Sequence, residues 1–194
     1  PHIGTDILAD VIKRMREFMT ENGVEFLFET CVTGFSTGKN GNLKSIELNH
    51  DRQIDTDCLI LAIGHSARDT FSLLQEKGLN MQAKSFAVGF RVEHPQSEVN
   101  LTQYGDLYAD KLPAAPYKVT ANLPSGRGVY SFCMCPGGYV VNASSMKEKT
   151  CVNGMSYSGR SGKNANSAII VSVSPADYGA QDPLDGMHFQ ETLE

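Results

Sequence analysis

Two cysteines, Cys133 and Cys135, stand one residue apart in an apolar run that stops at Pro136, Gly137 and Gly138. Side chains alternate along a strand, so this spacing predicts that both thiols point to the same side of one strand. Such thiols can be ordinary core, a functional thiol beside a cofactor, or metal ligands. Core packing is favoured, because a redox pair is normally spaced C-x-x-C and a closed zinc site needs four ligands. We therefore assign no metal ligands.

A polar loop follows at residues 153–168 and contains Tyr157. Its amide, hydroxyl and cationic groups are typical of a solvated loop, but they would equally suit contacts with a polar substrate or cofactor. Within it, residues 154–161 match a Walker A loop except that Arg160 takes the place of the lysine. Arginine does not replace that compact cation, so the sequence does not favour nucleoside triphosphate binding.

Residues 58–63 form a continuous apolar run, which predicts a strand buried on both faces of a parallel sheet. The run ends at Gly64, and Ser66 stands where a helix N-cap belongs, with Asp69 three residues later. A glycine turn feeding a helix N-terminus can hold a phosphate, although an ordinary turn is the alternative because the G-x-G-x-x-G pattern is absent. His65 alone is more typical of a turn than of a catalytic base. The helix should bury a stripe of apolar residues: Ala67, Phe71, Leu74 and Leu79.

The remaining elements follow from periodicity. Apolar residues at helical spacing predict a helix over 5–21, stopped by Asn22 and Gly23. Alternation predicts a strand over 24–32 and another over 42–49, joined as a hairpin at about 36–42. From residue 84, six short apolar runs predict an antiparallel sheet or barrel. Near the end, Asp182 and Pro183 suit the start of another helix.

The 194 residues carry a net charge of −5, and their basic residues are scattered. This disfavours a nucleic-acid-binding module. No apolar run approaches the roughly 20 residues that span a bilayer, which predicts no membrane partner and a cytoplasmic location. The five cysteines are odd in number and sparse, so a disulfide framework is not expected.

Five segments together resemble a family of uncharacterised bacterial FAD-dependent dehydrogenases, within the two-dinucleotide-binding-domain flavoproteins: "PHIGTD", "TDCLILAIGHSARDT", "FAVGFRVEHP", "GVYSFCMCPGGYVV" and "NGMSYSGRSGKNANSAIIVSV". The resemblance implies that the T-D-x-x-I-x-A-x-G strand lies near the flavin nucleotide. It also implies that Cys133 to Gly138 face the isoalloxazine ring. The residues expected to bind cofactor are Thr56, Asp57, Ala62, Gly64, His65, Ser66, Gly137 and Gly138.

The expected fold class is α+β. An incomplete Rossmann-like portion of the FAD domain would occupy residues 1–83, and a β-rich inserted substrate domain residues 84–173. Residues 174–194 would be the start of a return segment. The amino-terminal G-x-G-x-x-G of the family is absent from the sequence. We therefore expect an internal fragment of an FAD-dependent oxidoreductase that is inactive alone and does not retain FAD.

In the parent protein, Cys133, Cys135 and Tyr157 are the candidates for groups near the reactive face. A small-molecule substrate is expected, while NAD(P) as electron donor and the oligomeric state are left open. Two alternatives also stay open. One is a non-catalytic ligand-binding module, which would not need the two thiols. The other is an RNA-modifying flavoenzyme, which the acidic balance disfavours.

Overall fold

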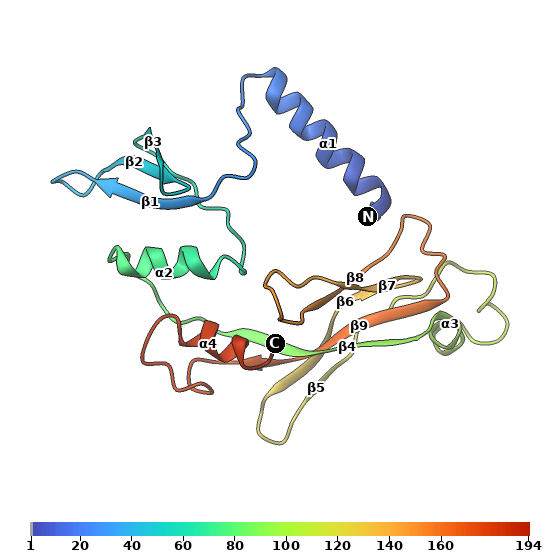
Figure 1. Ribbon diagram of the computed structural model, residues 1–194. Coiled ribbons are helices and arrows are strands. Elements are labelled where there is room, and N and C mark those ends of the chain that lie inside the picture. The colour runs from blue at the N-terminus through green and yellow to red at the C-terminus, as the bar shows by residue number, and fades with distance from the viewer. Residues whose placement is uncertain (1) are drawn as a thin grey trace. The chain divides into compact units, whose positions relative to one another are not determined.

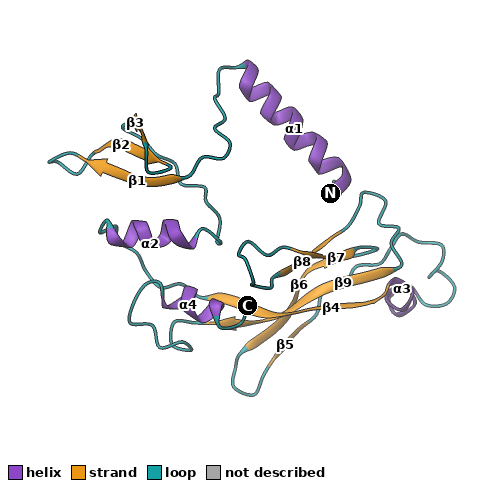
Figure 2. Cartoon of the chain, viewed as in Figure 1, coloured by secondary structure: helices purple, strands orange, loops and turns teal. Residues whose placement is uncertain are grey.

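The computed structural model describes residues 2–194 and divides them into two compact units. Unit 1 contains the residues up to 22, residues 84–177 and Glu194. Unit 2 contains residues 23–83 and 178–193. The ribbon can be followed by residue number in Figure 1 and by element type in Figure 2. Helices and mostly antiparallel strands confirm the expected α+β class, while the domain limits drawn from the sequence stay a prediction.

Unit 1 is built on a four-stranded antiparallel sheet in the order β4-β9-β6-β5. A separate antiparallel pair, β7-β8, lies near it in Figure 1. These are the six runs expected after residue 84, arranged as an open sheet and a ribbon rather than as a barrel. The strands are β4 (Phe86–Pro95), β5 (Thr120–Asn122), β6 (Gly128–Cys135), β7 (Tyr139–Asn142), β8 (Val152–Met155) and β9 (Asn164–Val173).

One end of this sheet is covered by α3 (Gln96–Tyr104), a helix that the sequence did not predict. Val99 on α3 and Ala165 on β9 form a small core with Ala115, and Ala115 and Ala165 have no exposed surface. Tyr104, Tyr117 and Met134 pack against it. The small alanines let α3 and the loop approach the sheet closely.

The expected first helix is confirmed as α1 (Thr5–Glu21) in unit 1. Its start is fixed by Asp6, whose carboxylate accepts bonds from the backbone N–H of Ser158 at 2.8 Å and from its hydroxyl at 2.7 Å. None of its residues is buried. Its apolar stripe is exposed instead, with Ile12 at 56% and Phe18 at 66%.

Unit 2 begins with an antiparallel sheet in the order β1-β2-β3, formed by β1 (Val32–Thr37), β2 (Leu43–Leu48) and β3 (Arg52–Asp55). The hairpin expected at about 36–42 is confirmed by the pairing of β1 with β2. The strand expected at 24–32 is wrong except at its last residue: the chain is irregular until Val32, where β1 begins, and Phe28 is 67% exposed. Among residues 2–194 no strand pairs with this segment, so alternation alone did not make it a strand.

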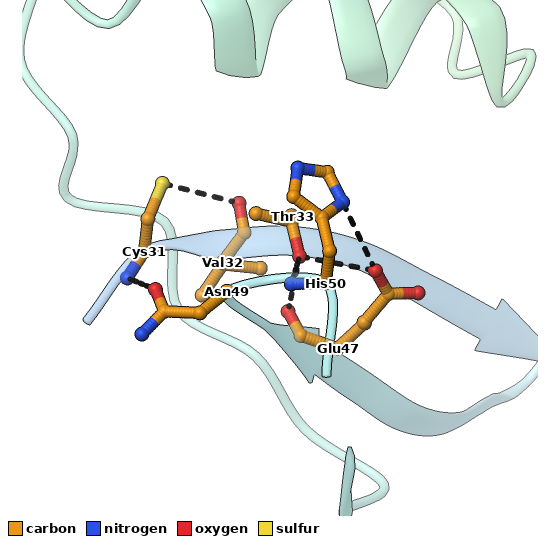
Figure 3. A network of polar contacts seen from close by, with 6 residues as sticks. All are labelled: Cys31, Val32, Thr33, Glu47, Asn49 and His50. Carbon is orange, nitrogen blue, oxygen red and sulfur yellow. Dashed lines mark hydrogen bonds and ion pairs between the residues drawn. The ribbon is translucent and has the colours of Figure 1, made fainter. Parts of the chain in front are cut away.

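The turn after β2 is held by a polar network (Figure 3). The Asn49 side chain accepts a bond from the Cys31 backbone N–H at 2.8 Å. The Thr33 hydroxyl donates to the Glu47 carboxylate at 3.1 Å and accepts from the His50 backbone N–H at 2.9 Å. Because all of these bonds close the turn, we interpret the network as structural.

Two helices, α2 (Arg68–Glu76) and α4 (Asp185–Glu191), complete unit 2. They are linked by an ion pair between Arg68 and Glu191 at 3.3 Å. The expected apolar stripe of α2 is confirmed at Leu74, which is 8% exposed, but is wrong at Leu79, which is 42% exposed beyond the helix end.

The buried strand expected at 58–63 is wrong in this structure. The segment has no strand pairing, and Ile60 is 85% exposed. A parallel strand is buried only between neighbouring strands, and none lies beside this run among residues 2–194. In the same described range, no helix is long and apolar enough to cross a bilayer.

Candidate functional site

The turn that follows β6, residues 135–138, is buried at every position. The Gly137 backbone N–H donates to the Gln96 side chain at 2.8 Å, and the Ser156 hydroxyl donates to the Pro136 carbonyl at 3.0 Å. Gly137 has φ of 51°, and a Cβ there would overlap the Arg160 carbonyl oxygen. The glycine is therefore needed for a close approach, and in this structure the approaching group is the backbone of the polar loop.

The two cysteines do not point to the same side of a strand, so that expectation is wrong. Cys133 is exposed, whereas Cys135 is 7% exposed. The pairing of β6 with β9 shifts between Phe132 and Cys135, and Cys133 adopts φ of 48°. A bulge adds a residue and breaks the simple alternation. Only one of the thiols is therefore available at the surface.

Cys135 is surrounded by polar groups despite its burial. Its thiol donates a hydrogen bond to the Cys133 carbonyl oxygen at 3.4 Å. Burial raises the pKa of the Cys135 thiol, and the nearby Cys133 raises it further, while Arg91 and a bond with Ser156 act in the opposite direction. The protonated thiol is the favoured form, so Cys135 is a weak nucleophile in this state.

Arg91 on β4 is a candidate residue that the sequence analysis missed. Its guanidinium donates to the Cys133 carbonyl at 3.2 Å, to Asn166 Oδ1 at 2.7 Å and to Asn153 Oδ1 at 3.2 Å. Asn166 on β9 has no exposed surface. The alternating run at 86–95 offered no signal that this arginine differs from a surface arginine, because its three acceptors come from distant segments.

Gly154 on β8 closes this cluster. A Cβ at Gly154 would overlap Asn166 Oδ1 and Arg91 Nη1 and would come within 2.9 Å of Cys135 Sγ. Three polar groups from three strands therefore converge on one glycine. We call Arg91, Cys135, Asn153 and Asn166 the arginine cluster.

Tyr157 lies in the loop that covers the turn, but its ring contacts Tyr139, at 5.8 Å between ring centroids. The Tyr157 carbonyl accepts a bond from the Arg160 backbone N–H at 3.1 Å. Tyr157 is 46% exposed. Its hydroxyl has no hydrogen bond among residues 2–194. It is thus brought near the turn by its loop, without a contact that assigns it a chemical role.

The other expected cofactor residues belong to unit 2. The Thr56 hydroxyl donates to the Cys58 carbonyl at 2.9 Å, and Asp57 and Ala62 are exposed. Gly64 is also exposed, has φ of 68°, and has no atom within 4 Å of the place where a Cβ would stand. The backbone before α2 is therefore open to a flat or phosphate-bearing group.

The expected Ser66 cap is wrong. Helix α2 starts at Arg68, its N-cap is Ala67, and no side chain caps it. The Ser66 hydroxyl instead lies 3.2 Å from His65 Nδ1. The rigid strand that would have set the start of the helix is not formed, and the helix begins one residue later than the sequence pattern predicts.

No group of three or more histidine, cysteine or acidic side chains in residues 2–194 is placed to hold a metal ion. A shallow pocket in unit 2 is lined by the aromatic rings of Tyr178 and Phe189 with Asp182, Asp185 and His188. None of the expected site residues lines it. Backbone N–H donors from Asp182 and Gln181 lower the pKa of Asp185. The Asp185 carboxylate therefore already accepts hydrogen bonds within its own turn.

Comparison with known proteins finds two family matches along the chain. Residues 85–194 match the family described as FAD-dependent protein, C-terminal domain-like. The chain belongs to this family. Residues 2–96 match the pyridine nucleotide-disulphide oxidoreductases, a Rossmann-type family. Both matches agree with the resemblance that the sequence carries.

The full chain also aligns with a protein of Clostridium beijerinckii that is described as an uncharacterized protein. The two are 47% identical over 195 residues. The chain spans 36% of the length of that relative. The relative is therefore much longer than the part that these 194 residues represent.

Proposed function

We propose that this chain carries the substrate domain and an adjoining part of the flavin-binding portion of an FAD-dependent dehydrogenase. The observation that carries the proposal is the family match of residues 85–194, joined to the oxidoreductase match of residues 2–96. When bound, FAD supplies the hydride or electron transfer, and the protein supplies position and electrostatics. A small-molecule substrate is the partner that this chemistry requires.

The part of unit 2 that would hold the nucleotide is the segment from Thr56 to Ser66. Its residues suit such a group, because Gly64 leaves the backbone open directly before α2. A helix N-terminus can offer backbone N–H groups to an anion. In this structure the N–H groups of Arg68 and Thr70 donate to Ser66 O and Asp69 Oδ1, so an anion would have to replace these acceptors. The proposal also explains the exposed apolar run at 58–63. In the longer polypeptide it would be a strand buried between neighbouring strands, and such strands are apolar.

The experiment compares the visible absorption spectrum of the full-length protein with that of the 194-residue chain mixed with FAD. Flavin bands that stay with the full-length protein through gel filtration would support the proposal. A colourless full-length protein that does not take up added FAD would overturn it.

A matched pair of variants sharpens the test. Gly64→Ala and Gly41→Ala both place a side chain at an open, positive-φ glycine in unit 2, at φ of 68° and 81°. Only Gly64 belongs to the proposed nucleotide segment. We expect the Gly64 variant of the full-length protein to retain less FAD, while the Gly41 variant retains as much as the parent. Equal retention by both variants would argue against this segment.

A non-catalytic binding module is the second candidate, because the arginine cluster is a polar site that does not require a reactive thiol. Replacing Cys133 and Cys135 by alanine separates the two functions. If ligand binding and turnover of the full-length protein are both unchanged in this variant, neither thiol takes part in the reaction.

A further inference from the structure

The guanidinium of Arg91 carries a charge that the described chain does not neutralise. Its three acceptors are a backbone carbonyl and two side-chain amides, all neutral, and within residues 2–194 it forms no ion pair. The residue is half-buried. A charge removed from water is normally paired with an opposite charge, because losing hydration is costly. The structure therefore holds a half-buried cation in a fixed orientation, with no carboxylate within ion-pair distance among the described residues.

A second observation at the same place is independent of that charge. Asn166 has no exposed surface, and its Nδ2 group is buried without an acceptor among the described residues. Arg91 Nε is likewise buried without an acceptor among the described residues. Buried donors are nearly always satisfied in folded proteins, and an exception calls for an absent ion, water or ligand. Each of these two neighbouring side chains thus has one buried nitrogen without an acceptor among the described residues.

The sheet register shows what lies beside the cation. Ala168 on β9 is paired with Arg91 on one side and with Phe132 on the other. Directly paired residues share one face of a sheet, so these three side chains form a row. Phe132 is 60% exposed. The row therefore places an open aromatic ring across a small alanine from the guanidinium.

We propose that Arg91 and Phe132 form a binding subsite for an organic carboxylate with a flat apolar body. The carboxylate pairs with the guanidinium, which Asn153 and Asn166 hold in place, and the apolar body lies over Ala168 against the Phe132 ring. A carboxylate forms a charge-assisted hydrogen bond with a guanidinium. Arg91 Nη1 already donates twice and Nε is buried, so the N–H that can meet the carboxylate is the second one on Nη2. That this ligand is the substrate of the longer enzyme rests on the proposed function; the binding itself does not.

The test uses benzoate as the probe and benzamide, its neutral counterpart of the same shape, as the control ligand. Binding to the 194-residue chain is measured by titration calorimetry and by NMR shifts. We expect benzoate to bind and benzamide to bind at least about tenfold more weakly, the difference that a charge-assisted contact provides. Equal binding of both ligands, or binding of inorganic phosphate without benzoate, overturns the proposal.

Variants locate the site. Arg91→Met should weaken benzoate binding by about tenfold or more, and Arg91→Lys should weaken it less, because the charge stays while the fork is lost. Asn153→Ala removes an exposed support of the guanidinium together with a bond to the Gly154 backbone N–H, and it keeps the test valid if the Arg91 variants fold poorly. Arg14→Met, at an exposed position of α1, is the control for net charge. Unchanged benzoate affinity in the Asn153 and folded Arg91 variants, or an equal loss in the Arg14 variant, overturns the proposal.

Because this assay contains no FAD, its outcome is independent of flavin binding by the full-length protein. Benzoate binding in a protein that takes up no flavin would uphold the subsite and reject the dehydrogenase. Flavin uptake by the full-length protein without benzoate binding to the 194-residue chain would reject the subsite and leave the dehydrogenase proposal standing.

Discussion

Replacing Gln96 by leucine should destabilise unit 1, because the Gln96 side chain holds the turn after β6 by hydrogen bonds. Gln96 is 6% exposed and makes three bonds: its Oε1 accepts from Gly137 at 2.8 Å, and its Nε2 donates to the Ala115 carbonyl at 3.0 Å and to Asn100 Oδ1 at 2.8 Å. Leucine has a similar volume but makes none of them. A buried backbone group left without a partner costs about 1–3 kcal/mol.

Two backbone groups would lose their partner in this variant, the Gly137 N–H and the Ala115 carbonyl, while Asn100 Oδ1 still accepts from Ala115 at 2.9 Å. The free energy of unfolding should therefore fall by about 3 kcal/mol, a change of roughly a hundredfold in the folding equilibrium. Urea unfolding followed by near-ultraviolet circular dichroism measures it. Gln103→Leu, at an exposed position of the same helix, is the matched control. A fall in the free energy of unfolding below about 1 kcal/mol, or one equal to that of the control, would refute the reasoning. A lost hydrogen bond that leaves no buried group without a partner costs only about 1 kcal/mol.

Three further outcomes are expected. Gly137→Ala should lower the melting temperature of unit 1 strongly, because its Cβ would overlap the Arg160 carbonyl, whereas Gly105→Ala, also at positive φ but with open space, should lower it less. Arg127 donates to the carboxylate of Asp177 and holds the pKa of that carboxyl well below its usual range. The pair therefore stabilises the fold above the ordinary carboxyl pKa, and this stabilisation is lost as pH falls. Asp177→Asn should flatten the acid side of the plot of stability against pH, and an unchanged slope would contradict the prediction. Iodoacetamide should label Cys133 before Cys135, because Cys133 is exposed and burial raises the pKa of the Cys135 thiol; mass spectrometry that finds Cys135 labelled first would count against the bulged geometry.

The parts of the fold that could be predicted from the sequence are those whose partners lie close along the chain. The helix at α1 and the hairpin between β1 and β2 follow from local periodicity and turn residues. The antiparallel character of the strands after residue 84 follows from their short spacing. Helix α3 was missed because Pro95 and the polar residues at its start hide a short helix of weak amphipathic pattern.

The candidate site could be predicted only in part. The tight glycine turn after β6 was visible as Gly137 and Gly138, but the bulge that separates Cys133 from Cys135 was not, because alternation assumes unbroken pairing. The arginine cluster depends on residues from β4, β6, β8 and β9. No local pattern reports such a meeting, so Arg91 emerged only from the structure.

The wrong expectation at 58–63 and the exposed apolar side chains of unit 2 have one physical explanation. An apolar run acquires strand structure from the neighbours that bury it, and periodicity describes only the run. Phe28 and Ile60 are strongly exposed, although their segments carry the composition of buried strands. Residues 2–96 match a Rossmann-type family, and the chain spans 36% of the length of its relative. Under the proposed function, these apolar segments would belong to a larger sheet. Apolar patches of this kind favour association, so we expect the 194-residue chain to self-associate at high concentration and the full-length protein to do so less, which sedimentation velocity on both would measure.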